Sequence, residues 1–277
     1  MNEITLKANA KLNLTLDICG KREDGYHLLD SVMQSISLYD TVKLQISDKI
    51  SVCCDCKEIN GEDNIAYLSA VKFFEYVGIS GGVKISISKN IPLSSGMGGG
   101  SADAAAVICG LNKLYKTSLN ETELCKIGVA VGADLPFCII GGTARVSGIG
   151  EKVEKLCDIP QCYIVVVKAG EKSSTKDMYK KLDGMACLSL NTDEMIKAIN
   201  NRSIKDISLN CINAFSSVFD YNDIKEVFIK TLPLGVSLSG SGPTVFGIYD
   251  GKEKAQRCAE LLNGIVTVPK SKGIIIE

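Results

Sequence analysis

The chain is poor in the side chains that many metal centres and nucleophilic active sites use. It has one histidine, His27, and no tryptophan. A centre built from several histidines is therefore excluded, and a Ser-His-Asp or Cys-His arrangement would have to use His27. Among its 12 cysteines, Cys53 and Cys56 have a Cys-x-x-Cys spacing. A zinc site needs a second ligand pair at matching spacing, and none is present. We interpret the cysteines as reduced, mostly buried residues of a cytosolic protein.

Long apolar runs and an excess of one charge are also absent. The 31 Lys and Arg residues nearly balance the 32 Asp and Glu residues, so no overall positive field can hold a nucleic acid or an anionic membrane. No stretch approaches the ~18 apolar residues of a membrane helix, and no secretory signal opens the chain. We expect a cytoplasmic protein without nucleic-acid or membrane partners. Any polyanionic ligand must be bound by a local group of residues, because the overall charge does not attract it.

Residues 12–18 alternate between apolar and polar side chains. The apolar positions run from Leu12 to Ile18, and the polar positions include Asn13. This period of two predicts a half-buried strand, with Lys11 on the same polar face as Asn13.

The rest of the chain mixes helical and strand-like segments without a regular order. Helical spacing or capping signals predict helices over residues 64–77, 101–115 and 120–132. Near the end of the chain we predict a helix over 252–263 and a strand over 265–268. This irregular order favours an α+β fold over a doubly wound sheet. We predict a boundary near residues 157–161 between two domains, 1–158 and 159–277.

A segment rich in glycine and serine gives the strongest local signal. It reads Pro92-Leu93-Ser94-Ser95-Gly96-Met97-Gly98-Gly99-Gly100-Ser101-Ala102 and lies between a predicted strand and a predicted helix. Glycines let backbone amides approach a phosphate closely, and a helix start adds unpaired N–H groups. The Walker A and dinucleotide patterns both fail, because the required lysine or third glycine is missing. We predict a phosphate-binding loop of another type, with a flexible surface loop as the alternative.

The pattern Pro-x-x-x-Gly-x-Gly-Gly-Gly-Ser-x-x-Ala-Ala resembles the phosphate-binding motif of the GHMP kinases, such as galactokinase and homoserine kinase. Two further stretches, at 10–14 and 239–244, resemble the other motifs of this superfamily in the same order. The resemblance implies a two-lobed α+β fold. Its N-terminal domain has a left-handed βαβ unit, its C-terminal domain is ferredoxin-like, and the active site lies between them. It also implies a small-molecule kinase that uses ATP with Mg2+.

The resemblance also implies roles for single residues. Asp134 corresponds to the catalytic base, which accepts the proton of the substrate hydroxyl, with Lys11 beside it. Taken alone, Asp134 is more typical of a turn before a proline, and Lys11 of a solvated strand. The resemblance implies that residues 92–102 bind ATP. Ser101 is a candidate Mg2+ or phosphate contact, with a plain helix N-cap as the alternative. Asn64 is a candidate adenine or ribose contact, although capping the following helix is the stronger interpretation.

The stretch 21–27 resembles a segment of one GHMP branch, whose substrate is diphosphocytidyl-methylerythritol. The implied reaction transfers the γ-phosphoryl group of ATP to the 2-hydroxyl of this cytidine diphosphate conjugate, in the non-mevalonate isoprenoid route. Tyr26 offers an aromatic face for cytosine, and His27 offers a donor and an acceptor for its edge. Tyr179 is a candidate second face, with a packed helix residue as the alternative. The other expected substrate contacts are Asn13, Ser239, Gly240, Ser241 and Gly242.

The sequence departs from the usual motifs of this branch at two places, and two alternative functions stay open. The segment Lys168-Ala169-Gly170 lacks the Lys-Pro that this branch often has, so the position of Tyr179 stays open. Met97 replaces a usual leucine, a volume-conserving change. Another GHMP small-molecule kinase is one alternative function, which the stretch 21–27 disfavours. A non-catalytic nucleotide-binding sensor on the same fold is the other.

Overall fold

The computed structural model describes residues 2–171, 174–183 and 192–277. The strands are β1 (Glu3–Asn13), β2 (Thr15–Lys21), β3 (His27–Ser47), β4 (Ser51–Cys54), β5 (Gly82–Ser88), β6 (Thr143–Gly148), β7 (Lys152–Lys155), β8 (Tyr163–Lys168), β9 (Ile212–Asn213), β10 (Gly235–Ser239), β11 (Thr244–Tyr249), β12 (Ile265–Thr267) and β13 (Ile274–Ile276). The α-helices are α1 (Ile65–Val77), α2 (Gly99–Leu114), α3 (Glu121–Val129), α4 (Leu135–Ile140), α5 (Thr175–Asp183), α6 (Thr192–Asn200), α7 (Ile204–Leu209), α8 (Asn222–Lys230) and α9 (Lys252–Leu262). Short 3-10 turns are η1 (Lys57–Ile59) and η2 (Ala214–Ser217).

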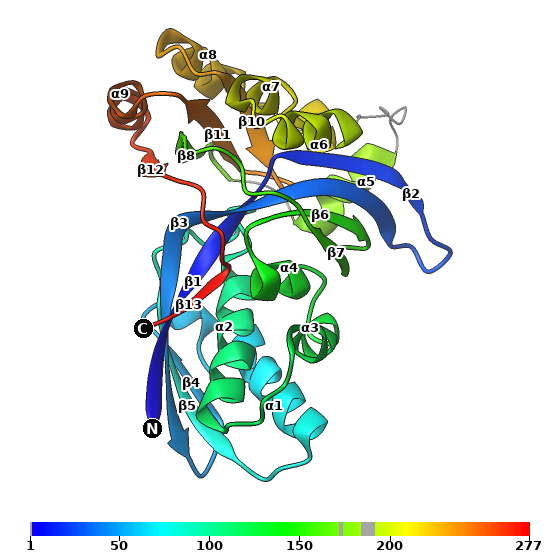
Figure 1. Cartoon of the computed structure of the whole chain (residues 1–277), viewed down its shortest axis with the longest axis vertical. Helices are drawn as coiled ribbons and strands as arrows, with labels where there is room; N and C mark the ends of the chain where they lie inside the picture. Colours follow the sequence, from blue (N-terminus) through cyan, green and yellow to red (C-terminus); the bar gives the residue numbers. More distant parts are fainter. Residues whose placement is uncertain (1, 172–173, 184–191) are drawn as a thin grey trace.

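The chain forms two lobes that the long strand β3 connects (Figure 1). This strand has 21 residues and pairs with β1, β2, β5 and β6 in the larger sheet. Strands β4 and β5 are parallel neighbours, and α1 lies between them in the chain. They form a βαβ unit within an otherwise mostly antiparallel sheet, and the left-handed sense that the resemblance implies stays a prediction.

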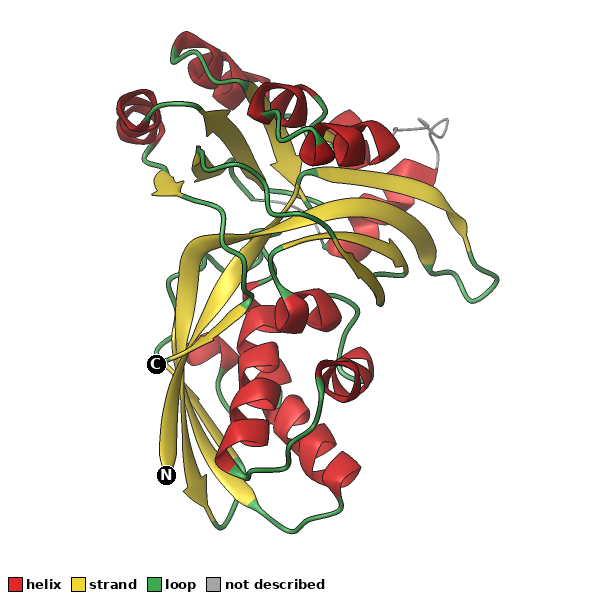
Figure 2. Cartoon of the chain, viewed as in Figure 1, coloured by secondary structure: helices red, strands yellow, loops and turns green. Residues whose placement is uncertain are grey.

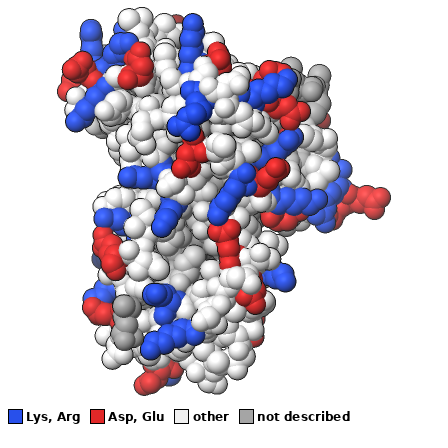
Figure 3. Space-filling model, viewed as in Figure 1, with Lys and Arg blue, Asp and Glu red and all other residues white. Residues whose placement is uncertain are grey.

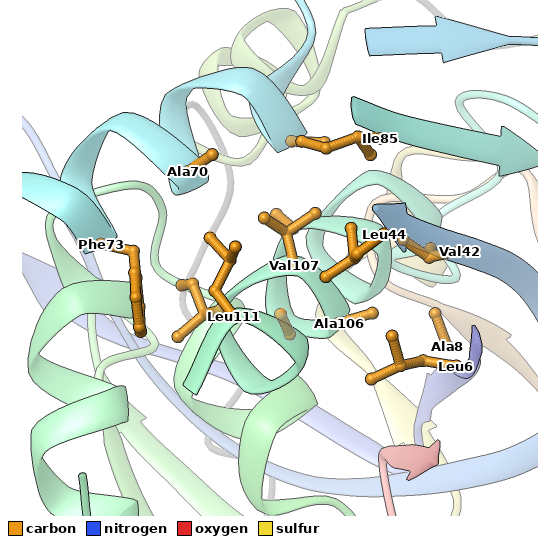
Figure 4. Close-up of a cluster of buried hydrophobic side chains, with 14 of the residues drawn as sticks. Leu6, Ala8, Val42, Leu44, Ala70, Phe73, Ile85, Ala106, Val107 and Leu111 are labelled. Carbon is orange, nitrogen blue, oxygen red and sulfur yellow. The ribbon is translucent and has the colours of Figure 1, made fainter. Parts of the chain in front are cut away.

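Helices α1 to α4 cover one face of the larger sheet (Figure 2). The alternation in β1 and β3 puts Leu6 and Leu44 on this face, where both are fully buried. Leu44 lies beside Val107 of α2, and both leucines belong to one apolar cluster with Phe73 of α1 (Figure 4). A Cβ at Gly110 would lie 2.4 Å from Leu44 Cδ1, so a glycine there lets α2 pack directly on the sheet. This packing fixes the start of α2 relative to β1.

The smaller sheet has the strand order β10-β11-β8-β12, and every neighbouring pair is antiparallel. Along the chain, helices α5 to α7 separate β8 from β10, and α9 separates β11 from β12. This order and pairing is the βαββαβ arrangement of a ferredoxin-like domain, so the predicted fold class is confirmed. The predicted boundary near residue 158 falls between β7 and β8. Because β9 and β13 return to the larger sheet, the division 1–158 and 159–277 stays a prediction.

Several local predictions differ from the structure. The predicted half-buried strand over 12–18 is the end of β1 and the start of β2, and its polar positions Asn13, Thr15 and Asp17 are buried as well. Helix α2 begins at Gly99, two residues before the predicted start. Strand β13 was not expected at all, and it pairs antiparallel with β1 beside the N-terminus (Figure 1). A segment of three isoleucines shows no readable period, so tertiary pairing decides its structure. The amide Nδ2 of Asn9 also holds this end of the chain by donating to the carbonyl of Lys272, at 2.8 Å.

The surface and the cysteines largely match expectation. Lys and Arg are interspersed with Asp and Glu on the visible face (Figure 3), and no helix in the described ranges is long and apolar enough to cross a membrane. The eleven cysteines in the described part are free thiols. Cys19, Cys53 and Cys157 are exposed, so these three are exceptions to the interpretation of the cysteines as buried residues. Burial raises the pKa of the Cys109 thiol to about 12, which makes it a poor nucleophile.

Candidate active site

The phosphate loop lies against both of the other predicted motifs. The N–H of Lys11 donates to the carbonyl of Met97 at 3.0 Å, which ties β1 to the loop. From β10, the hydroxyl of Ser239 donates to the carbonyl of Gly96 at 3.2 Å. Three segments that are far apart in the sequence therefore meet at one point.

The buried side chain of Asn13 links β1 to the C-terminal glycine motif through hydrogen bonds. Its Nδ2 donates to the hydroxyl of Ser31 at 2.9 Å. Its Oδ1 accepts from the N–H of Gly240 at 3.0 Å and from the ammonium of Lys11 at 2.8 Å. The alternation in β1 puts Lys11 and Asn13 on the same face, as predicted. Asn13 thus fixes the ammonium of Lys11 relative to the C-terminal glycine motif.

Lys11 and Asp134 come together, although 122 positions separate them in the sequence. Lys11 Nζ lies 3.4 Å from Asp134 Oδ2. The Lys11 side chain is 6% exposed and that of Asp134 is 33% exposed. Asp134 stands at the N-cap position of α4, but its side chain makes no capping hydrogen bond. Its carboxylate therefore faces the lysine and the cavity instead of serving the helix.

The start of α2 lies at the wall of the same cavity. Gly98 is the N-cap residue, with φ +69° and no side-chain cap, and Gly98, Gly99 and Gly100 all line the cavity. The first N–H groups of a helix have no partner within it, so these amides suit an anion. Ser101 also lines the cavity. Because Gly98 holds the N-cap position, the alternative that Ser101 caps this helix was wrong.

A buried ionic cluster lies beneath the phosphate loop. The ammonium of Lys89 pairs with Asp40 and, at 2.6 Å, with Asp103 of α2. Burial raises the pKa of Asp103 to about 7; the charge of Lys89 opposes this shift and that of Asp40 adds to it. Asp103 Oδ1 is buried without a partner among the described residues. Sequence reasoning missed this cluster, although an aspartate inside an apolar helix stretch was a possible signal.

Aromatic side chains gather at the other end of the cavity. The rings of His27 and Tyr179 are stacked, with centroids 4.6 Å apart and an interplanar angle of 22°. Tyr179 also meets the ring of Phe215 edge-on at 4.9 Å. Burial, followed by the charge of Asp134, raises the pKa of Tyr179 to about 12. Tyr26 lies at the cavity wall but is 60% exposed. The structure thus pairs His27 with Tyr179 and leaves Tyr26 at the rim.

One cavity of about 1150 Å³ contains both ends of this site. Most of the residues predicted from the sequence line it, namely Lys11, Asn13, Tyr26, His27, Pro92, Leu93, Ser94, Ser95, Gly96, Gly98, Gly99, Gly100, Ser101, Asp134, Tyr179, Gly240 and Ser241. Its volume exceeds that of most single-ligand pockets, so it has room for a nucleotide and a second substrate.

The other predicted residues stand behind the cavity wall. Met97 and Ala102 are buried in apolar clusters, and Ser239 and Gly242 support the loop from outside. Asn64 caps α1, as the stronger interpretation held. Its Oδ1 accepts from the N–H of Ala66 at 2.8 Å.

The chain matches two family models, which are described as the GHMP kinases N terminal domain at residues 64–142 and the GHMP kinases C terminal at residues 187–263. The fold and the three motifs define a small-molecule kinase of this class. A 4-diphosphocytidyl-2-C-methyl-D-erythritol kinase from Clostridium tetani is 44% identical over 91% of this chain and 93% of its own. One from Caldicellulosiruptor saccharolyticus is 43% identical over 93% and 92%. The chain therefore belongs to the family of 4-diphosphocytidyl-2-C-methyl-D-erythritol kinases within the GHMP kinases.

Solved structures agree with this placement. A crystal structure of 4-(cytidine 5'-diphospho)-2C-methyl-D-erythritol kinase superposes with a TM-score of 0.76 at 28% identity, covering 96% of this chain and 98% of its own. Homoserine kinase from Cytophaga hutchinsonii superposes with a TM-score of 0.82 at 22% identity, covering 100% and 98%. At this lower identity the second likeness shows the shared fold alone.

Proposed function

We propose that this chain transfers the γ-phosphoryl group of ATP to the 2-hydroxyl of 4-diphosphocytidyl-2-C-methyl-D-erythritol, in the non-mevalonate route to isoprenoid precursors. One observation carries the proposal: a single cavity joins the phosphate loop and the Lys11–Asp134 pair to the aromatic end at His27 and Tyr179. The named relatives support the choice of substrate. Because both substrates are small and soluble, we also infer a cytoplasmic enzyme without nucleic-acid or membrane partners.

Phosphoryl transfer requires mainly positioning and charge stabilisation. In this proposal the amides of the loop and of the start of α2 hold the phosphates of ATP. The carboxylate of Asp134 accepts the proton of the attacking hydroxyl as the new P–O bond forms, while the bond from the γ-phosphorus to the bridging oxygen breaks and that oxygen leaves with ADP. Lys11 is held between Asn13 and Asp134, where it orients the carboxylate and offsets the negative charge that gathers there.

The residues also fit the use of Mg2+ with ATP. Among the described residues, no three His, Cys, Asp or Glu side chains are grouped to hold a metal ion. Magnesium keeps several waters and binds substrate phosphates with few protein ligands, so a site of this kind needs no such group. The hydroxyl of Ser101, at the cavity wall, is the protein contact that we propose. Bound with ATP, the ion neutralises charge on the transferred group.

The test is ATP consumption by the purified chain with magnesium and 4-diphosphocytidyl-2-C-methyl-D-erythritol. Mevalonate, homoserine and galactose are tested in parallel. We expect turnover with the cytidine compound alone. Turnover with another alcohol would keep the kinase chemistry but overturn the substrate. ATP binding without any turnover would favour a nucleotide sensor instead.

A further inference from the structure

Asp183, at the end of α5, joins three elements at the aromatic end of the cavity. Its Oδ1 lies 2.6 Å from His27 Nε2, and its Oδ2 lies 2.6 Å from Lys21 Nζ. Lys21 and His27 are directly opposite each other in the β2–β3 pairing, so their side chains lie on the same side of this hairpin. One carboxylate therefore holds both sides of the hairpin against α5. Sequence reasoning assigned no role to Asp183.

The geometry of α5 lets it contact His27 in two ways. Asp183 follows Tyr179 by four positions, and residues at this spacing lie on the same face of a helix. Tyr179 stacks on the face of the imidazole, and Asp183 accepts at its edge. The His27 side chain is only 11% exposed. The position and the rotation of the ring are thus both determined by α5.

The carboxylate also occupies one ring nitrogen and leaves the other for a ligand. Hydrogen bonds from Lys21 and His27 hold the pKa of Asp183 below its ordinary value, so the group is an ionised acceptor. An ionised acceptor requires a proton on Nε2. The neutral Nε2–H tautomer and the imidazolium both satisfy this requirement, whereas the neutral Nδ1–H tautomer does not. No residue in the described ranges is hydrogen-bonded to Nδ1, and His27 lines the cavity.

We propose that Asp183 is a positioning residue for the nucleotide substrate, because it holds the His27 ring so that Nδ1 meets the polar edge of the base. The proposal rests on the proposed function, which makes that base a cytosine. The Watson–Crick edge of cytosine carries both an amino donor and a ring-nitrogen acceptor, so Nδ1 can serve in either protonation state. Asp183 acts through His27 and does not touch the reacting atoms.

Steady-state kinetics test this role through Asp183→Leu, which removes the acceptor, and Asp183→Asn, which keeps its size and a neutral acceptor. We expect Asp183→Leu to raise the KM for the cytidine substrate about 10- to 100-fold, because a hydrogen bond to a charged group is lost. Asp183→Asn should raise it less. The KM for ATP and kcat at saturation should not change. The control is Glu194→Gln on α6, which removes an exposed carboxylate paired with Lys197, and thermal melts show that each variant folds.

A double-mutant cycle separates action through His27 from a general tie between hairpin and helix. If Asp183 acts through the ring, Asp183→Leu adds nothing to the KM of His27→Ala. An equal increase of KM in both backgrounds would overturn the proposal, as would an unchanged KM in the wild-type background.

The single histidine of the chain gives a readout that does not need turnover. Nitrogen NMR of His27, well above the ordinary histidine pKa, should show Nε2 protonated and Nδ1 unprotonated in the wild type. Asp183→Leu should increase the Nδ1–H share. A wild-type spectrum dominated by Nδ1–H, or identical spectra in both proteins, would overturn the proposal. If the wild type does not phosphorylate the cytidine compound, the proposed function fails, and this spectrum still decides whether Asp183 orients His27.

Discussion

Gly96 is required by the close approach of two chain segments. Its φ is +82°, in the left-handed region that L side chains rarely adopt. A Cβ there would lie 2.6 Å from the carbonyl oxygen of Ser239 and 2.7 Å from that of Gly242. Both neighbours are backbone atoms, which cannot rotate away. The glycine thus allows the phosphate loop to rest on the C-terminal motif.

We expect Gly96→Ala to lower the free energy of unfolding by about 3 kcal/mol, through backbone strain and displacement of the loop. It should also reduce kcat/KM at least tenfold. The matched control is Gly100→Ala, where the nearest atom to a new Cβ is Ile65 Cγ2 at 3.6 Å. Alanine should leave stability there unchanged or slightly higher, because it favours helix. Equal losses in urea unfolding of both variants would contradict this account of the loop.

Single functional residues could be predicted where they lie in a sequence motif that resembles those of the GHMP kinases. Lys11 and Asp134 were named from the sequence, and the structure places them side by side. Lys89 and Asp183 were missed, because an isolated lysine or aspartate in the sequence gives no sign of its partner. Their partners come from other elements, so the signal exists only in the folded chain.

Helix α1 offers a test between two roles for one side chain. Asn64 accepts from Ala66 N–H and donates to the carbonyl of Ile59, which occupies it in capping. We expect Asn64→Ala to lower the free energy of unfolding by about 1 kcal/mol, whereas Asn64→Ser should keep most of the stability. Neither variant should change the KM for ATP. A KM for ATP that rises in both variants would show that Asn64 contacts the nucleotide.

A clear local period predicted strand structure and the facing of side chains, but not where a strand ends. The alternation over residues 12–18 gave the shared face of Lys11 and Asn13 correctly, whereas the structure divides these residues between β1 and β2 and buries the polar positions as well as the apolar ones. The start of α2 was placed two residues late, because glycines are poor helix formers in isolation. Here Gly99 and Gly100 are helical because the rest of α2 packs on the sheet. Strand β13 depends on β1 for its pairing, which no local pattern reveals.

The buried cluster of Asp40, Lys89 and Asp103 makes the free energy of unfolding of the whole molecule depend on pH. The pKa of Asp103 rises from an ordinary 3.8 to about 7 on folding. Between these values the folded state therefore holds a proton that the unfolded state has lost. The contribution of this group is fully present below the lower value and is lost as pH rises toward 7.

We expect Asp103→Asn to remove this loss. Relative to the variant, the free energy of unfolding of the wild type should fall by up to about 1.4 kcal/mol per pH unit between pH 5 and pH 7. Urea unfolding of both proteins at these two pH values measures the difference, and titrating groups outside this cluster cancel in the comparison. Parallel pH profiles would mean that Asp103 is already ionised in the folded chain.

The proposed role of Asp134 is tested by the turnover number of Asp134→Asn with ATP and 4-diphosphocytidyl-2-C-methyl-D-erythritol, measured beside the wild type. Asparagine keeps the size of the side chain and removes the base. We expect kcat to fall about 10²- to 10⁴-fold, while the binding of ATP and the thermal stability stay close to those of the wild type. A kcat near that of the wild type would contradict the assignment of Asp134 as the catalytic base.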